Sequence, residues 1–404
     1  MAKALTALDR FGCLCTHHCT RRRDVALKGH SSSVHTTQTP CTTQTKSMVA
    51  IDLTPLSVDD DTPPVAQRAE LHLDSQTLDE LFAPELWSAL APGLDGADDA
   101  APFEVAAGDG EKLRAALAAD GFVAVERPPP WCVDVSRLAR AAASLAAHGF
   151  PPGFLLAYEA SWRLQAQLAT VISTATGGNV ATGDAIAFRV EPGASGFGPH
   201  RDRQPEDPAA TFREDDAPRS NVAWVALSRA TPANGCMYVV PRGGDAAYAE
   251  GGDGKVGDPV AAALGADEAS GAKACYQRVR ALPLDAGGFL LLSHRVVHWG
   301  AAAAPDHREP PRVALSFGFA DPALEPCLFV DAAMARRPPL DARVALAAAQ
   351  QVVYARNDSK RRKHDLALFH RVFKARQHYF TEAFRRKVSD RYQWLTFLRK
   401  AGGG

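Results

Sequence analysis

The stretch Asn221–Pro241 reads NVAWVALSRATPANGCMYVVP and is the part of the chain that best indicates the fold class. It contains two short apolar runs rich in β-branched and aromatic residues, Val222–Leu227 and Met237–Val240. Pro232 and Gly235 lie between them. Short runs of this composition, bounded by turn-forming residues, are typical of β-strands. The stretch therefore predicts two strands of a larger β-structure.

Further runs of the same kind flank this stretch between Ala185 and Ala320. Gly, Pro and Asp residues separate them, and a series of short strands with turn signals predicts a β-barrel or sandwich. The Gly/Ala/Asp-rich segment 243–271 is expected to be a long insertion loop. The additional predicted strands are Ile186–Val190, Phe289–Leu292, Val296–Trp299 and Val313–Phe319.

Helical spacing precedes and follows the β-rich part. We predict helices within 110–120, 133–148 and 162–174, with a short strand at Phe122–Val125. In the last 65 or so residues, apolar side chains recur every three or four positions, which predicts more helix. The opposite face is basic and is expected to be solvated, with an anion- or nucleic-acid-binding surface as the alternative. Its residues are Arg371, Lys374, Arg385, Arg386 and Lys387.

Composition limits the class of protein. The 404 residues are 46% hydrophobic and carry a formal net charge of -1. Such a chain can bury a sizeable core, and its charge gives no reason to expect nucleic acid or a membrane as partner. No apolar run approaches the ~20 residues of a membrane helix, so a soluble protein is expected. Eight cysteines in a chain of this length favour a reducing intracellular compartment.

The first 64 residues differ from the rest. They are rich in Ser, Thr, Arg and His, with few carboxylates before Asp52, and are predicted to be a disordered or targeting segment. This composition resembles an organelle transit peptide, although a disordered tail or sequence upstream of a start at Met48 would look the same. We therefore expect a cytoplasmic or organellar protein. Residues 65–330 are predicted to form the main domain, with a β core at about 185–320, and residues 331–404 a basic helical extension.

One triplet suggests metal chemistry. His200-Arg201-Asp202 sets an imidazole and a carboxylate two residues apart, and on a strand such residues share a face. A third ligand must come from elsewhere. His298 ends an apolar strand and is favoured by its Trp-Gly context, while His294 remains a competitor. Two histidines and one carboxylate are typical of non-haem Fe(II) oxygenases, and leave positions open for other ligands.

Arg312 adds a cation to this arrangement. It opens the last predicted strand, and a hairpin from His298 would return it to the end of the barrel that holds the metal. An arginine is suited to bind a carboxylate through two parallel hydrogen bonds. The combination predicts a metal site that takes 2-oxoglutarate and O2.

Four segments of this region resemble the phytanoyl-CoA dioxygenase family of Fe(II)/2-oxoglutarate-dependent oxygenases. The resemblance covers about residues 105–320. Its most specific part is the central stretch with its Trp strand, Asn-Gly turn and Val-Pro exit. The matching segments are GFGPHRDR (Gly196–Arg203), the stretch Asn221–Pro241, HRVVHWG (His294–Gly300) and the strand that begins at Arg312.

The resemblance implies an α+β fold with a double-stranded β-helix (jelly-roll) core, flanking helices and a C-terminal helical extension. It implies that His200, Asp202 and His298 bind iron and that Arg312 binds the far carboxylate of 2-oxoglutarate. Trp224 would line the 2-oxoglutarate pocket, unless it is only a core aromatic. The implied reaction is hydroxylation of a small-molecule or acyl-CoA-type substrate, with release of succinate and CO2.

The sequence also departs from the family pattern. Arg242-Gly243-Gly244 stands where Gly-Ser-His commonly follows the Val-Pro exit, and Gly300 stands where many members have Ser. The carboxylate of Asp202 favours hydroxylation over halogenation. Two other classes remain open: a metal-dependent cupin-like enzyme that uses no oxoacid, and a non-catalytic interaction module that uses the basic C-terminal helix. The motifs do not specify the substrate.

Overall fold

The structure is a computed structural model, and it describes residues 71–95, 107–126, 129–202, 208–249, 258–265, 276–355 and 363–401. The chain divides into two units, Met1–Pro64 and Val65–Gly404, and every described residue belongs to the second. The predictions for residues 1–64, including the targeting segment, lie outside the described residues.

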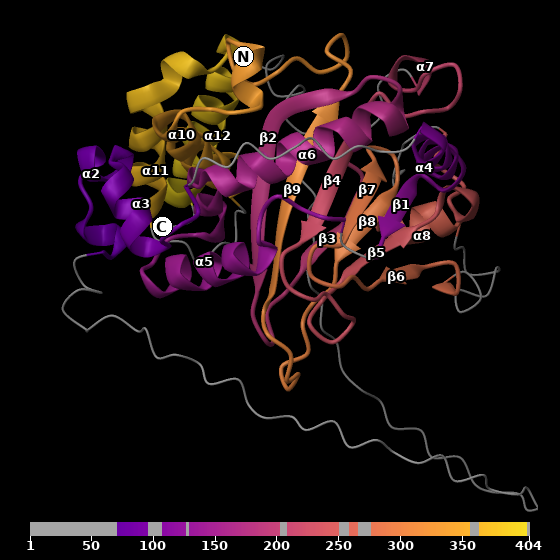
Figure 1. Cartoon of the computed structure of the whole chain (residues 1–404), viewed down its shortest axis with the longest axis horizontal. Coiled ribbons are helices and arrows are strands. Elements are labelled where there is room, and N and C mark those ends of the chain that lie inside the picture. The colour runs from indigo at the N-terminus through magenta and orange to yellow at the C-terminus, as the bar shows by residue number, and fades with distance from the viewer. Residues whose placement is uncertain are drawn as a thin grey trace, which may run out of the picture. The chain divides into compact units, whose positions relative to one another are not determined.

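Two antiparallel sheets form the centre of the second unit (Figure 1). The larger sheet has the strand order β1-β7-β4-β9-β2, and the smaller has β3-β8-β5-β6. With the helices, they confirm the predicted α+β class. Strands β3 and β6 lie outside the predicted runs. The bounds are β1 Phe122–Val125, β2 Val180–Val190, β3 Phe197–His200, β4 Ser220–Ala226, β5 Met237–Val240, β6 Arg280–Leu282, β7 Phe289–Ser293, β8 Val297–Gly300 and β9 Arg312–Ala320.

Alternation of side chains gives the larger sheet two apolar faces. On one face, Leu315 and Phe317 of β9 pack against helices. On the other, Trp224 of β4 and Leu290 of β7 face residues of the smaller sheet, such as Val239. One hydrophobic core therefore lies between the two sheets, and a second lies between the larger sheet and the helices. This arrangement leaves the inner face of the smaller sheet directed at the larger sheet.

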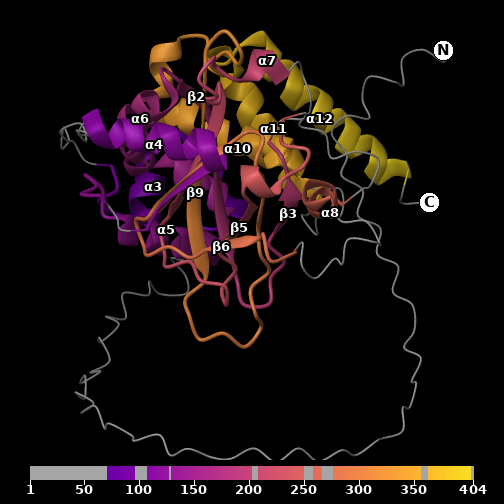
Figure 2. The same ribbon diagram turned by 90° about the vertical axis from the view of Figure 1, so that its right-hand side faces the viewer.

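Helices cover the outer face and one edge of the larger sheet. Figure 1 shows α6 crossing that face and α10, α11 and α12 grouped beside the edge strand β2. Figure 2 shows α12 on the outside of this group. No helix among those described is long and apolar enough to cross a membrane. The helices are α2 Leu78–Phe82, α3 Pro84–Leu90, α4 Ala107–Asp120, α5 Val135–Ala147, α6 Glu159–Thr176, α7 Pro208–Thr211, α8 Pro259–Leu264, α10 Leu340–Val353, α11 Lys363–Arg376 and α12 Glu382–Ala401, with short 3-10 turns between them.

The C-terminal helices follow the predicted apolar spacing. Phe373, Phe384 and Val388 are fully or almost fully buried, in the same core as the helices that precede the sheets. Arg386 and Lys387, on the basic face, are exposed. The spacing thus identified the buried face of this segment correctly.

The segment 243–271 is not simply a loop, contrary to the prediction. It contains α8, which begins after Asp258, whose carboxylate accepts hydrogen bonds from the backbone of Val260 and Ala261. The helix ends at Gly265, which has a positive φ of 60°. It packs on the outer face of the smaller sheet against Val297. A helix of six residues is too short to produce a clear periodic signal. Residues 250–257 and 266–275 lie outside the described residues.

The predicted hairpin between His298 and Arg312 is also wrong. β8 belongs to the smaller sheet and β9 to the larger, so residues 301–311 cross from one sheet to the other. β3 lies beside β8. Gly196, the residue just before β3, is in close contact with the end of β8. A Cβ atom at Gly196 would overlap the carbonyl oxygens of Gly300 and Ala301. The short β3 can therefore approach β8 only because residue 196 has no side chain.

We expect Gly196→Ala to destabilise the protein by about 1–3 kcal/mol, because the added methyl group would push β3 away from β8. Gly198→Ala is the matched control, since nothing lies within 4 Å of a Cβ at that position. Urea unfolding measures both variants. Equal stability of the two would show that the close approach at Gly196 is unimportant.

Candidate metal centre

Two histidines face each other across the pairing of β3 and β8. His200, the last residue of β3, is the register partner of His298 on β8. Their ring centroids are 4.4 Å apart. His298 is buried, whereas 30% of the His200 side chain is exposed. The pairing therefore sets one buried and one accessible imidazole side by side.

Hydrogen bonds fix the tautomer of both rings. Nδ1 of His200 lies 2.8 Å from the carbonyl oxygen of Gly198, and Nδ1 of His298 lies 3.1 Å from that of Val296. A carbonyl oxygen only accepts, so each Nδ1 must carry the hydrogen and donate it. The lone pair of each ring is then on Nε2. This is the usual arrangement of histidines that bind a metal through Nε2.

Asp202 completes the group from just beyond the strand. β3 ends at His200, so Asp202 does not lie on a strand, contrary to the prediction. Its Oδ1 is nevertheless 3.4 Å from Nε2 of His200 and 3.6 Å from Nε2 of His298. Ligands held about 2 Å from one metal ion at right angles lie roughly 3 Å apart. One ligand atom from each of the three side chains lies within 4.8 Å of the other two, so the group could close around one metal ion.

Charge at the site suits a divalent cation. Burial lowers the pKa of His298 to about 4, against the opposing effect of the Asp202 carboxylate and with a smaller lowering by the neighbouring His200. Burial raises the pKa of Asp202, but His298 and His200 outweigh this effect and hold the pKa below its ordinary value. At neutral pH the imidazole of His298 is therefore neutral beside the carboxylate of Asp202, and a metal would replace the protons that the imidazoles bind at low pH.

The structure does not bring His294 into this group. His294 lies in the turn before β8 rather than on the strand, so the predicted ambiguity with His298 does not arise. It is fully buried, and its Nδ1 donates to the carbonyl of Ser220 at 2.9 Å. His307, in the segment between β8 and β9, is half-buried, and both its ring nitrogens are covered.

Arg312 extends from the larger sheet toward the smaller sheet, which carries His200 and His298. Only 2% of the residue is exposed, and its Nε and Nη1 have no hydrogen-bond partner among the described residues. Its guanidinium carbon lies 5.5 Å from the ring centre of Trp224, which is itself buried. A Cβ at Gly300 would be 3.0 Å from Nη2 of Arg312. The guanidinium therefore reaches the smaller sheet two residues beyond His298.

The protonation state of Arg312 matters for what it can bind. Burial lowers its pKa to about 10, which still leaves the guanidinium charged at neutral pH. A buried charge without a partner is unfavourable by several kcal/mol. This part of the core is thus prepared for an anion. The predicted hairpin does not form, but the guanidinium of Arg312 still reaches Gly300, two residues beyond His298; its role in binding an oxoacid stays a prediction.

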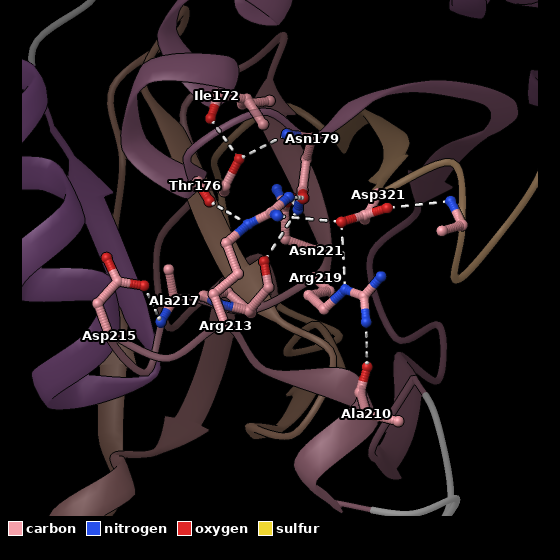
Figure 3. Close-up of polar contacts among 12 residues, drawn as sticks. Ile172, Thr176, Asn179, Ala210, Arg213, Asp215, Ala217, Arg219, Asn221 and Asp321 are labelled. Carbon is pink, nitrogen blue, oxygen red and sulfur yellow. Dashed lines mark hydrogen bonds and ion pairs between the residues drawn. The ribbon is translucent and has the colours of Figure 1, made fainter.

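A network of polar contacts secures the segment that follows the metal group, as Figure 3 shows. Asp321, just after β9, accepts hydrogen bonds from Arg213 at 3.0 Å and from Arg219 at 3.2 Å. Arg213 also donates to the carbonyl of Thr176, at the end of α6. The chain between α7 and β4 is thereby fixed to the end of the larger sheet.

The sequence did not indicate that Arg201, which lies between His200 and Asp202, is paired with Asp245. Arg201 and Asp245 form a bidentate ion pair, and neither side chain is exposed. The Arg in the triplet was the only signal, and nothing in the sequence around Asp245 indicates this role.

A hollow of about 400 Å³ lies elsewhere and is not the metal site. It is lined in part by Tyr238 and Trp299, which stack on each other. These two residues are neighbours of Val239 and His298, whose side chains alternate to the inner face. The hollow therefore lies on the outer face of the smaller sheet.

The geometry defines a class of site: two histidines on paired antiparallel strands and one carboxylate just beyond the end of a strand, the ligand set of mononuclear non-haem metal oxygenases. Residues 133–308 match the family model described as phytanoyl-CoA dioxygenase (PhyH), which confirms the resemblance found in the sequence. The matched segment includes His200, Asp202 and His298 and ends before Arg312.

Solved structures show distant similarity. The epimerase SnoN in complex with Fe3+, alpha ketoglutarate and nogalamycin RO is 22% identical over 53% of this chain and 84% of its own, with a TM-score of 0.37. The carbocyclase SnoK from nogalamycin biosynthesis is 17% identical over 55% and 87%, with a TM-score of 0.37. EctD from S. alaskensis, with 2-oxoglutarate and 5-hydroxyectoine, is 15% identical over 57% and 80%, with a TM-score of 0.35. Similarity at this level supports no inference about this chain. No curated protein matches it.

The low pKa of His298 predicts acid sensitivity of the metal-free protein. The folded pKa of about 4 lies below the ordinary 6.5, so the unfolded chain binds more protons between these values. The contribution of His298 to the free energy of unfolding should be fully present above pH 6.5. It should be lost as the pH falls toward 4, by on the order of 2–3 kcal/mol. Urea unfolding at pH 7 and pH 4.5 measures this loss, and His298→Asn should show a smaller one. A loss of the same size in His298→Asn would contradict the assignment.

Proposed function

We propose that this protein is an Fe(II)- and 2-oxoglutarate-dependent dioxygenase that hydroxylates a small-molecule or acyl-CoA-type substrate and releases succinate and CO2. The observation that carries the proposal is the buried guanidinium of Arg312, whose Nε and Nη1 have no hydrogen-bond partner among the described residues, beside the group of His200, Asp202 and His298. A metal group alone would fit many enzymes. A metal group with a fixed cation in the adjoining core fits one that uses an oxoacid.

The three side chains fit iron in charge and number. Two neutral Nε2 donors and one carboxylate are the ligand set of non-haem Fe(II) oxygenases. Each imidazole is oriented by its Nδ1 hydrogen bond to a backbone carbonyl, so both rings are prearranged for the ion. Because the described residues supply three ligands, the remaining positions would be open to an oxoacid and to O2.

Arg312 fits the far carboxylate of 2-oxoglutarate. Its Nε and Nη1 have no hydrogen-bond partner among the described residues, and a guanidinium can donate two parallel hydrogen bonds to one carboxylate. Trp224 packs against the guanidinium and limits its movement. When bound, Fe(II) and 2-oxoglutarate supply the O2-dependent oxidising chemistry. The roles of the chain are to bind these groups, to hold their orientation and to exclude water.

The order of the strands supports the proposed double-stranded β-helix. Going along the chain from β2 to β9, successive strands alternate between the larger and the smaller sheet, except that β5 and β6 both lie in the smaller one. Eight strands wound in this way are what a jelly roll requires. In this winding, His298 of β8 and Arg312 of β9 both face the space between the two sheets.

The wall beside His200 favours a substrate with an apolar portion near the metal. Phe197 lies 4.7 Å from the His200 ring, and Phe188 lies 6.2 Å from Phe197, measured between ring centres. Both phenylalanines are half-buried. An acyl chain would suit such a wall, as would other apolar groups.

Two alternatives remain as outcomes of the tests. A cupin-like metal enzyme without an oxoacid would leave the buried charge of Arg312 unexplained. A non-catalytic module that acts through the basic face of α12 would not need the metal group at all.

The proposal predicts a spectroscopic signal. Under anaerobic conditions, Fe(II) and 2-oxoglutarate should together give the weak visible charge-transfer band of a chelated oxoacid. Asp202→Ala should abolish Fe(II) binding, and Arg312→Ala should raise the Kd for 2-oxoglutarate about tenfold or more while Fe(II) still binds. Arg219→Ala, which alters a partly exposed ion pair, is the control. If the wild-type protein retains no iron and shows no band, the proposed function is wrong.

Gly300 offers a second test that leaves every ligand in place. A methyl group at this position would press on Nη2 of Arg312 from 3.0 Å. We therefore expect Gly300→Ala to weaken 2-oxoglutarate binding several-fold without changing Fe(II) affinity, as titration of the same band would show. A change in Fe(II) affinity alone would place Arg312 outside the oxoacid site.

A further inference from the structure

Arg201 lies between two proposed metal ligands but points away from them. The side chains of His200 and Asp202 converge with that of His298, whereas the side chain of Arg201 is directed to a buried carboxylate outside this group. Its side chain is completely buried, which is rare for an arginine and requires a partner. That partner is Asp245, 44 residues further along the chain.

The ion pair is bidentate. Nη1 of Arg201 lies 2.5 Å from Oδ2 of Asp245, and Nη2 lies 3.0 Å from Oδ1. Asp245 is in turn held by the backbone N–H of Ala247, which donates to Oδ1 at 3.0 Å. The backbone N–H of Asp245 donates to the carbonyl of Arg242. The carboxylate therefore offers Arg201 a fixed position rather than a mobile one.

The same guanidinium also reaches the turn that leads to the third ligand. Nη1 of Arg201 donates to the backbone carbonyl of Arg295. The next carbonyl, that of Val296, accepts the Nδ1 hydrogen bond that orients the ring of His298. One side chain thus connects the segment that carries His200 and Asp202 to the turn that precedes His298.

We propose that Arg201 and Asp245 are positioning residues that set the spacing of His200, Asp202 and His298 for the metal. The inference rests on the proposed function, because it assumes that these three side chains bind a metal ion. Asp202 lies beyond the end of β3, where no ladder of backbone hydrogen bonds fixes it. The buried ion pair supplies that restraint from the opposite side of the chain.

A purely structural ion pair would lower stability when broken but would leave metal affinity unchanged. The test therefore compares two readouts on the full chain: the Tm of the metal-free protein, and the Kd for Co(II) with its visible d–d spectrum. Asp245→Asn keeps the shape but removes the charge. Arg201→Lys keeps the charge but loses the fork that allows two parallel hydrogen bonds.

Two further variants complete the design. The double variant Arg201→Met/Asp245→Leu replaces the pair with apolar side chains, a change that buried ion pairs often tolerate, and guards against loss of folding. Asp95→Asn is the matched control. It removes the carboxylate 3.5 Å from the buried Arg343, an ion pair between the α3–α4 connection and α10 that involves no proposed ligand.

We expect Asp245→Asn and the double variant to raise the Kd for Co(II) by 10- to 100-fold and to alter the d–d spectrum. Arg201→Lys should be intermediate, and Asp95→Asn should lower the Tm without changing the Kd. If wild type binds Co(II) and all the Arg201 and Asp245 variants bind it as tightly, the inference is wrong while the proposed function stands. If wild type does not bind Co(II), both are wrong.

Discussion

The pairing of β3 with β8, in the register that sets His200 opposite His298, is the constraint on which the rest of the site depends. Side chains of a strand alternate between faces, so a slip of one residue would turn either imidazole to the outer side of the sheet. β3 has only four residues, and its pairing with β8 already contains an irregularity. The close approach at Gly196 is a local feature that favours this register, and the Nδ1 hydrogen bonds of the two histidines then orient their rings.

Much of the fold could be predicted from the sequence, because burial dictates local composition. The runs at Met237–Val240 and Phe289–Leu292 became β5 and most of β7, and the helical spacing before and after the sheets identified real helices. Short elements escaped prediction. β3 and β6 contain few apolar residues, and α8 has too few turns to show periodicity. These elements exist because of tertiary contacts rather than local preference.

The site was predicted in its members but not in its geometry. His200, Asp202 and His298 do converge, yet the reason given for Asp202, a position on a strand, does not hold. Likewise Arg312 reaches the site by a crossing between sheets and not by a hairpin. The partnership of Arg201 with Asp245 could not be predicted at all, since it joins residues far apart in the sequence and only the folded chain brings them together.

The two buried arginines of this region show why the site is better explained by an anionic co-substrate than by folding alone. Arg201 has a bidentate carboxylate and a backbone carbonyl as partners, so the protein itself offsets the burial of its charge. Arg312 has a stacking Trp224 and two nitrogens without hydrogen-bond partners among the described residues. A cation–π contact contributes about 1–2 kcal/mol, whereas burying an unpaired ion costs several kcal/mol. The described residues thus supply a partner for Arg201, behind the proposed ligands, but no hydrogen-bond partner for two nitrogens of Arg312. A ligand with one carboxylate for Arg312 and a second group that binds the metal would offset this buried charge. 2-Oxoglutarate has both, a far carboxylate and an oxoacid end that chelates a metal ion.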